Sequence, residues 1–165
     1  MENIINYLKE NKGAATYSAA KKLNVPERDI LKAIPEEASY APVDAFDDIV
    51  ETVSGWGDIM MIVTNGSVIF EVKGTLPKGK HSHGFFNLHE KGNPVGGHLI
   101  ADKFDGIYFV SRPFMGKESH SIQIYDQQGD AGIKFYLGRD EKGEIKPEQR
   151  EKFMELKKRY AECGS

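Results

Sequence analysis

The sequence predicts an α+β protein, in which a helical first third is followed by an antiparallel sheet and a final helix. Residues 1 to about 55 space their apolar side chains at helical intervals, whereas residues 59 to about 138 form short runs rich in β-branched and aromatic residues. Short turns join these runs with no helix between them, which favours antiparallel pairing. We therefore expect a helical module, residues 1–55, packed on a sheet domain, residues 56–165, as one structural unit.

Three short helices are expected in residues 1–35, with a tight turn between the second and third, as in a helix-turn-helix or winged helix. Thr16 or Ser18 is expected to cap the second helix. Pro26 is expected to open the third, where its missing N–H costs nothing, and Pro35 to end it. The apolar positions that define these helices are Ile4, Ile5, Leu8, Ala19, Ala20, Leu23, Ile30, Leu31 and Ile34.

Residues 36–58 contain seven acidic residues and no Lys or Arg. Phe46, Ile49, Val50 and Val53 follow the i, i+3, i+4, i+7 spacing of an amphipathic helix. We therefore expect this helix to lie on the sheet with a solvated acidic face.

Six strands and a final helix are expected in the remainder of the chain. Turn sequences such as Asn65-Gly66 separate the strands, and Pro147 opens the helix, whose Phe153, Leu156 and Tyr160 would face inward. The expected strands are Ile59–Val63, Val68–Val72, Phe85–Leu88, Ile107–Val110, Ser121–Tyr125 and Ile133–Leu137.

Composition excludes several classes of protein. The 165 residues carry 22 Lys and Arg against 25 Asp and Glu, a net charge of −3, which argues against bulk nucleic acid or an anionic membrane surface as the main partner. No apolar run approaches the roughly 18 residues of a membrane helix. The single cysteine, Cys163, cannot form an internal disulfide. These features predict a cytoplasmic, reduced protein.

Common enzyme signatures are absent from the sequence: there is no nucleophile elbow, phosphate-binding loop, zinc-protease motif or CxxC pair. His81-Ser82-His83 has the spacing of metal ligands on one face of an extended chain. The neighbouring Lys78 and Lys80 are instead typical of a solvated basic loop. Both interpretations of the His-x-His segment remain open at this point.

A series of motifs between residues 79 and 140 is more specific. Taken in order, the motifs are Gly79-x-x-x-His83-Gly84-Phe85-Phe86-Asn87-Leu88, Gly97-His98-Leu99, Arg112-Pro113-Phe114-Met115-Gly116 and Lys134-x-Tyr136-x-Gly138-Arg139-Asp140. This series resembles the HutX/ChuX family of intracellular haem-utilisation carriers, relatives of the two-repeat HemS/ChuS haem-handling proteins. The resemblance covers most of the chain. It implies a sheet like one HemS/ChuS half, a homodimer that mimics the two-repeat relatives, and haem b as the ligand.

Haem requires an apolar cleft, an axial donor for the iron, and cations for its propionates. By the resemblance, His98 is the axial ligand and metal-binding residue, since Gly-His-Leu is where family members offer one. Relatives can carry a second histidine where this chain has Thr64-Asn65, neither a good iron ligand. A single axial ligand is therefore expected, with the opposite position open to water, Met115, a tyrosine or another histidine. The other expected haem-binding residues are the cationic Arg112 and Lys134 and the wall residues Phe114, Met115 and Tyr136.

The function expected from this resemblance is a haem carrier without a reaction of its own, which passes haem to a receiving or degrading protein. A haem-degrading enzyme, or an accessory to one, is the first alternative. A DNA-binding or interaction module is the second, but the third expected helix opens with Glu27 and Asp29, which phosphate would repel. No nucleic-acid or membrane partner is therefore expected.

Overall fold

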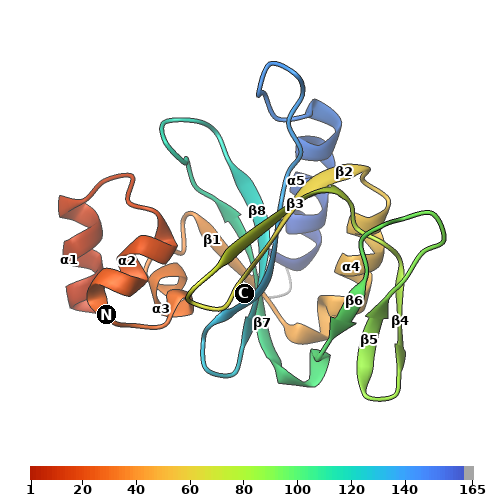
Figure 1. The fold of residues 1–165 in the computed structure, drawn as a ribbon. Helices are drawn as coiled ribbons and strands as arrows, with labels where there is room; N and C mark the ends of the chain where they lie inside the picture. The colour runs from red at the N-terminus through yellow and green to blue at the C-terminus, as the bar shows by residue number, and fades with distance from the viewer. Residues whose placement is uncertain (162–165) are drawn as a thin grey trace.

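The computed structural model describes residues 1–161, without the side chain of Ala161, so Cys163 lies outside the described residues. In this part of the chain, nine strands form two antiparallel sheets, one of six strands in the order β1-β7-β8-β9-β2-β3 and one of three in the order β4-β5-β6 (Figure 1). The predicted α+β class is confirmed. The strands are β1 Ala38–Ala41, β2 Asp58–Thr64, β3 Ile69–Thr75, β4 Gly79–Ser82, β5 Phe85–Leu88, β6 Gly97–Leu99, β7 Phe104–Ser111, β8 His120–Asp126 and β9 Ala131–Tyr136.

The helices cover both faces of the six-stranded sheet. Alternate residues of β7 separate the two faces: Ile107 and Phe109 belong to the core beneath α4 and α5, whereas Tyr108 and Val110 pack against α1–α3. We call these the α5 face and the module face. The helices are α1 Glu2–Glu10, α2 Thr16–Leu23, α3 Glu27–Lys32, α4 Phe46–Ser54 and α5 Pro147–Ala161, with 3-10 turns at Val43–Ala45 and Ala101–Lys103.

The helical module forms where the sequence predicts it, with differences at its helix ends. Thr16 does not cap α2; it lies in the first turn, and its Oγ1 donates a hydrogen bond to Oε1 of Glu27 at 2.7 Å. Pro26 precedes α3 as its N-cap residue instead of occupying its first position. The predicted apolar stripe is buried at Ile30 and Leu31.

The expectation that residues 1 to about 55 are all helical is wrong at β1. This strand pairs with β7 in the register Ala38↔Val110 to Ala41↔Ile107 and forms one edge of the large sheet. The acidic segment therefore contributes a strand before its predicted helix. That helix, α4, is confirmed, since Phe46, Ile49, Val50 and Val53 are all buried.

The three-stranded sheet was predicted only at its central strand, β5. Residues 79–82 were open to interpretation as a solvated loop, but they form β4 and pair with β5. β6 pairs with the other side of β5, in the register Phe86↔Leu99 to Leu88↔Gly97. Phe86 and Leu88 of β5 enter the main core, which anchors the small sheet beside α4 (Figure 1).

Helix α5 is fastened to the large sheet by the buried side chain of Gln149. Its Oε1 accepts a hydrogen bond from N of Gly138 at 2.7 Å, and its Nε2 donates to the carbonyls of Trp56 and Asp58, both at 2.9 Å. The predicted inward residues Phe153 and Leu156 are buried. Among the described residues, no helix is both long and apolar enough to cross a membrane.

Candidate functional site

A largely apolar hollow lies on the α5 face, between strands β2 and β3 and the small sheet. Its volume is about 480 Å³, within the range of small-molecule sites. Alternate residues of two paired strands form one wall, because Met61 and Val63 of β2 lie opposite Val72 and Phe70 of β3. Beyond this wall, the polar residues at the hollow are His98, Lys103 and Asp126. We call this cavity the His98 hollow.

His98 is exposed at the border of this hollow, on the edge strand β6 of the small sheet. Its Nδ1 lies 2.5 Å from Oδ1 of Asn87, the residue directly opposite on β5. Its ring also packs against Phe85, with the ring centroids 5.5 Å apart. The imidazole is therefore held by two residues of β5 while its border with the hollow stays open.

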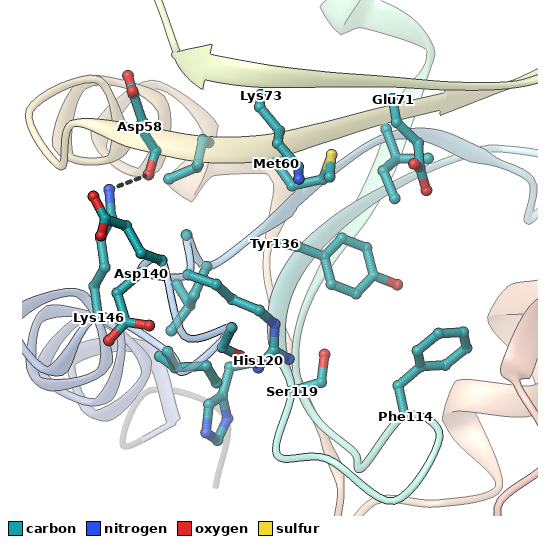
Figure 2. Close-up of a pocket in the computed structure, with 18 residues that line it drawn as sticks. Asp58, Met60, Glu71, Lys73, Phe114, Ser119, His120, Tyr136, Asp140 and Lys146 are labelled. Atoms are coloured by element: carbon teal, nitrogen blue, oxygen red, sulfur yellow. Dashed lines mark hydrogen bonds between the residues drawn. The ribbon is translucent and has the colours of Figure 1, made fainter.

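A second cavity occupies the module face, behind the same β2–β3 hairpin. It consists of two adjoining spaces of about 580 and 280 Å³ that share Ile62, Glu71, Phe114, Ser119 and Tyr136. Figure 2 shows the Tyr136 ring between Met60 above and Phe114 below. We call this cavity the Tyr136 groove. Its charged lining is mixed, with Lys73, Arg139 and Lys146 among the acids Asp58, Glu71, Asp140 and Glu141.

Tyr136 itself is a poor candidate for an iron ligand. Burial, with a smaller contribution from the charge of Glu27, raises the pKa of its phenol to about 12. Iron would have to displace this proton to bind a phenolate. The side chain is therefore suited to line a cavity with its ring and to donate a hydrogen bond with its hydroxyl.

The two cationic residues expected to bind propionates already have partners. Arg112 forms an ion pair with Glu37 at 2.5 Å and donates to the carbonyl of Ala14 at 2.9 Å. Lys134 lies 2.7 Å from Oε1 of Glu27, and both side chains are buried. In this structure both cations connect the sheet to the N-terminal segment.

The structure brings four of the six expected haem-binding residues together and separates His98 from them. Arg112, Phe114, Lys134 and Tyr136 all line the smaller part of the Tyr136 groove. That groove and the His98 hollow use alternate residues of β2 and β3, so they lie on opposite faces of one hairpin.

Met115, the sixth residue of the set, borders neither cavity. It is 84% exposed at the tip of the turn between β7 and β8. Within a single subunit, one flat ligand cannot contact both His98 and the residues of the groove.

Sequence reasoning did not single out several residues that border the hollow. Phe70 is 63% exposed on the edge strand β3, and Lys103 lies in a 3-10 turn after β6. One feature of the sequence could have pointed to Phe70, because it is a large aromatic residue beside the charged Glu71. The structure adds that its strand lies at an unpaired edge of the sheet. No comparable signal marks Lys103, because only the fold brings it to the cavity.

The His-x-His segment does not form a metal site with its neighbours. Nε2 of His81 lies 2.7 Å from Oδ1 of Asp47, and His83 sits in a turn with φ of 55°, bonded to Ser82. Across residues 1–161, no cluster of three or more His, Cys, Asp or Glu is placed to hold a metal ion.

Comparison with known proteins settles the family. The family model described as haem utilisation ChuX/HutX matches residues 39–156, which span both sheets and most of α5. This chain belongs to the ChuX/HutX family. It is 41% identical over 143 residues to the intracellular heme transport protein HutX of Vibrio cholerae, covering 86% of this chain and 74% of that one. HutX is described as a transport protein and ChuX as a heme binding protein, and the family as a whole is described by haem utilisation.

Solved structures extend the likeness to the fold. The heme binding protein ChuX superposes with a TM-score of 0.86 at 31% identity, over 94% of this chain and 97% of the other. ChuS, a heme degrading enzyme of Escherichia coli O157:H7, superposes with a TM-score of 0.75 at 18% identity, over 92% of this chain but only 47% of its own. The second match concerns the fold alone: this member of the ChuX/HutX family has the fold of one part of a chain about twice its length.

Proposed function

We propose that this ChuX/HutX protein binds haem b in the His98 hollow and carries it through the cytoplasm to a receiving or degrading protein, without a reaction of its own. One observation carries the proposal: an exposed imidazole borders an apolar cavity of about 480 Å³. Within residues 1–161, no other histidine borders this cavity.

The residues of the hollow fit the three chemical parts of haem. Phe70, Val63 and Val72 offer apolar contacts to the macrocycle. The iron accepts an imidazole nitrogen, which His98 would supply through Nε2, since its Nδ1 is bonded to Asn87. Lys103 is exposed at the same cavity and would meet a propionate.

The openness of this hollow suits a protein that must release its ligand. Phe70 and Val63 are 63% and 45% exposed, so the walls of the cavity are only half covered. Each 1.4 kcal/mol withheld from binding raises the dissociation constant about tenfold. An open cavity with one histidine ligand therefore favours transfer over permanent retention.

A homodimer is part of the proposal, and the uncovered edge of the large sheet supports it. β3 forms this edge, and Ile69 and Phe70 on it are 56% and 63% exposed. An apolar sheet edge invites pairing with another strand. Arg112, Phe114, Met115, Lys134 and Tyr136 would serve haem at His98 only if a second copy brought its Tyr136 groove against the first copy's hollow. Light scattering during gel filtration, with and without haem, measures this association.

The carrier proposal is tested by titrating the purified protein with hemin and following the Soret band. We expect saturation near one haem per chain, and a marked loss of affinity or a changed spectrum in His98→Ala. His89→Ala is the matched control, because His89 is also exposed but follows β5 and borders no part of the hollow. The absence of a saturable Soret shift would refute haem binding, and an unchanged His98→Ala would remove His98 from the site.

Incubation of the haem complex with ascorbate separates carriage from haem degradation. A persistent Soret band supports the carrier, whereas bleaching with release of a biliverdin-like product supports the enzymatic alternative. The DNA-binding alternative is less favoured by the geometry, because Glu27, Ile30 and Leu31 of α3 are buried and Arg28 is paired with Asp105. Binding of duplex DNA at physiological salt would support the DNA-binding alternative.

A further inference from the structure

The amide of Asn87 is held in one orientation by the backbone of its own hairpin. Its Nδ2 donates to the carbonyl of Ser82 at 3.0 Å and lies within 3.5 Å of the carbonyls of Phe85 and Lys80. Rotating the amide by half a turn would place Oδ1 against these three acceptors, with no hydrogen between them. The Oδ1 atom of Asn87 must therefore be the one that faces His98.

This orientation fixes which nitrogen of His98 carries the proton. Oδ1 of Asn87 can only accept, so Nδ1 of His98, 2.5 Å away, must donate. A neutral imidazole with a proton on Nδ1 has its lone pair on Nε2. Among the described residues, no hydrogen-bond partner is found for this Nε2, so its lone pair is available to a ligand, and the residue borders the hollow.

The strand pairing gives this arrangement its precision. Asn87 and His98 are directly opposed residues of β5 and β6, and Phe85 packs on the histidine ring from the same strand. Directly opposed residues have Cβ atoms about 4.5–5.5 Å apart, which leaves both side chains little freedom once they are bonded. The imidazole is thus oriented before any ligand arrives.

We propose that Asn87 is the positioning residue for the axial histidine, and that its neutral amide sets how strongly His98 donates to iron. This inference rests on the proposed function. Residues that accept the second N–H of a metal-bound histidine are commonly carboxylates or carbonyls, and they control its orientation and donor strength. A carboxylate at this position would draw the Nδ1 proton toward itself and make the imidazole a stronger donor. An amide leaves it a moderate donor, which suits a site that must release ferric haem.

Three variants test the proposal on the full-length protein. Asn87→Ala removes the acceptor and is expected to weaken haem binding about tenfold. Asn87→Asp keeps an acceptor for Nδ1 of His98 but places a second carboxylate oxygen beside three carbonyls, so its effect is measured on the haem that is bound, where a lower reduction potential is expected. It is also expected to raise the frequency of the ferrous iron–histidine stretch. Asn65→Asp adds the same charge at a turn that borders no part of the hollow, so it controls for net charge.

The signature of the bound haem distinguishes positioning from a merely structural role. Aspartate cannot donate to the carbonyls of Ser82, Phe85 and Lys80, so both Asn87 substitutions remove this structural support. Only a residue that sets the donor strength of His98 also shifts the reduction potential and the iron–histidine stretch. Circular dichroism establishes that each variant is folded. If Asn87→Asp leaves both the reduction potential and the iron–histidine stretch of the bound haem unchanged, the inference is wrong.

The His98→Ala variant separates failure of this inference from failure of the proposed function. An unchanged spectrum and affinity in His98→Ala would overturn haem ligation by His98, and the role of Asn87 with it. A loss of ligation in His98→Ala, with parental behaviour in both Asn87 variants, would overturn the positioning role alone.

Discussion

Glu27 of α3 and Lys134 of β9 form an ion pair with a distance of 2.7 Å between Oε1 and Nζ, and each residue is only 6% exposed. Thr16 donates to the same oxygen, so a buried polar cluster joins two helices of the module to the centre of the sheet. Lys134 was expected to bind a haem propionate, and Glu27 was expected to repel DNA. The structure instead pairs these two residues, which lie 107 positions apart in the sequence. Their contact fixes how the helical module sits on the module face.

Breaking this pair from one side is expected to destabilise the protein strongly. Glu27→Ala leaves the Lys134 ammonium buried without its partner, which costs about 3–5 kcal/mol in the free energy of unfolding. The double variant Glu27→Leu, Lys134→Met should recover most of this loss, because it removes both charges together. Urea unfolding measures all three proteins. A Glu27→Ala variant within about 1 kcal/mol of the parent would contradict the prediction.

Two neighbouring residues of β3 are expected to differ in their effect on haem affinity. Phe70→Ala removes an aromatic wall of the His98 hollow and should raise the haem dissociation constant about tenfold or more. Ile69→Ala is the matched control, since Ile69 is similarly exposed but belongs to the opposite face of the strand. Equal losses in both variants would instead indicate that both faces of the hairpin contact haem, as the composite dimer site requires.

Mild acid is expected to destabilise the fold through His120. Burial lowers the pKa of this imidazole, and the carboxylate of Glu118, 3.4 Å from Nε2, only partly opposes the effect. Because the unfolded chain binds the proton more readily, stability should be lost as the pH falls from about 6.5 toward the lowered value. His120→Gln should flatten the dependence of unfolding free energy on pH between 5 and 6.5. An equally steep slope in the variant would exclude His120 as the cause.

Gly138 is expected to be required for packing. A Cβ at this position would overlap the carbonyl oxygen of Asp58, a backbone atom that cannot rotate away. Gly138→Ala should therefore cost about 1–3 kcal/mol of stability. Gly97→Ala is the control, because a Cβ there meets no atom within 4 Å. Thermal unfolding of both variants gives the comparison, and equal melting temperatures would contradict this account.

The sequence predicts the elements that carry their own signal. α4, α5 and six strands have enough apolar or β-branched residues to be recognised without their partners. The missed strands β1, β4 and β6 contain three or four residues each and include Gly, Ser, Lys or His. These strands exist because a neighbouring strand supplies their hydrogen bonds, which no local pattern reveals.

The candidate site shows the same limit. The series of motifs in the sequence assigns His98, Tyr136 and Phe114 to one haem site. Successive side chains of β2 and β3, however, point to opposite faces of the hairpin, so the cavity at His98 and the cavity at Tyr136 and Phe114 lie on opposite faces. Apolar side chains stand on both faces of this hairpin, such as Phe70 on one and Ile69 on the other, so hydropathy does not tell which residue faces which cavity. The burial of Glu27 was equally hidden, because its partner Lys134 lies on β9, the ninth strand to follow it in the sequence.

The opposition of Asn87 and His98 across two strands has a consequence for tracing this arrangement in other proteins. Residues 89–96 connect the two strands, and this connection can lengthen or shorten without disturbing the pair, provided that the register of β5 and β6 is kept. A sequence search that requires a fixed number of residues between the asparagine and the histidine would therefore miss related proteins in which this loop is longer. Transfer of the arrangement to the rim of an unrelated apolar pocket would require β4 as well, because the carbonyls of Ser82 and Lys80 hold the Asn87 amide.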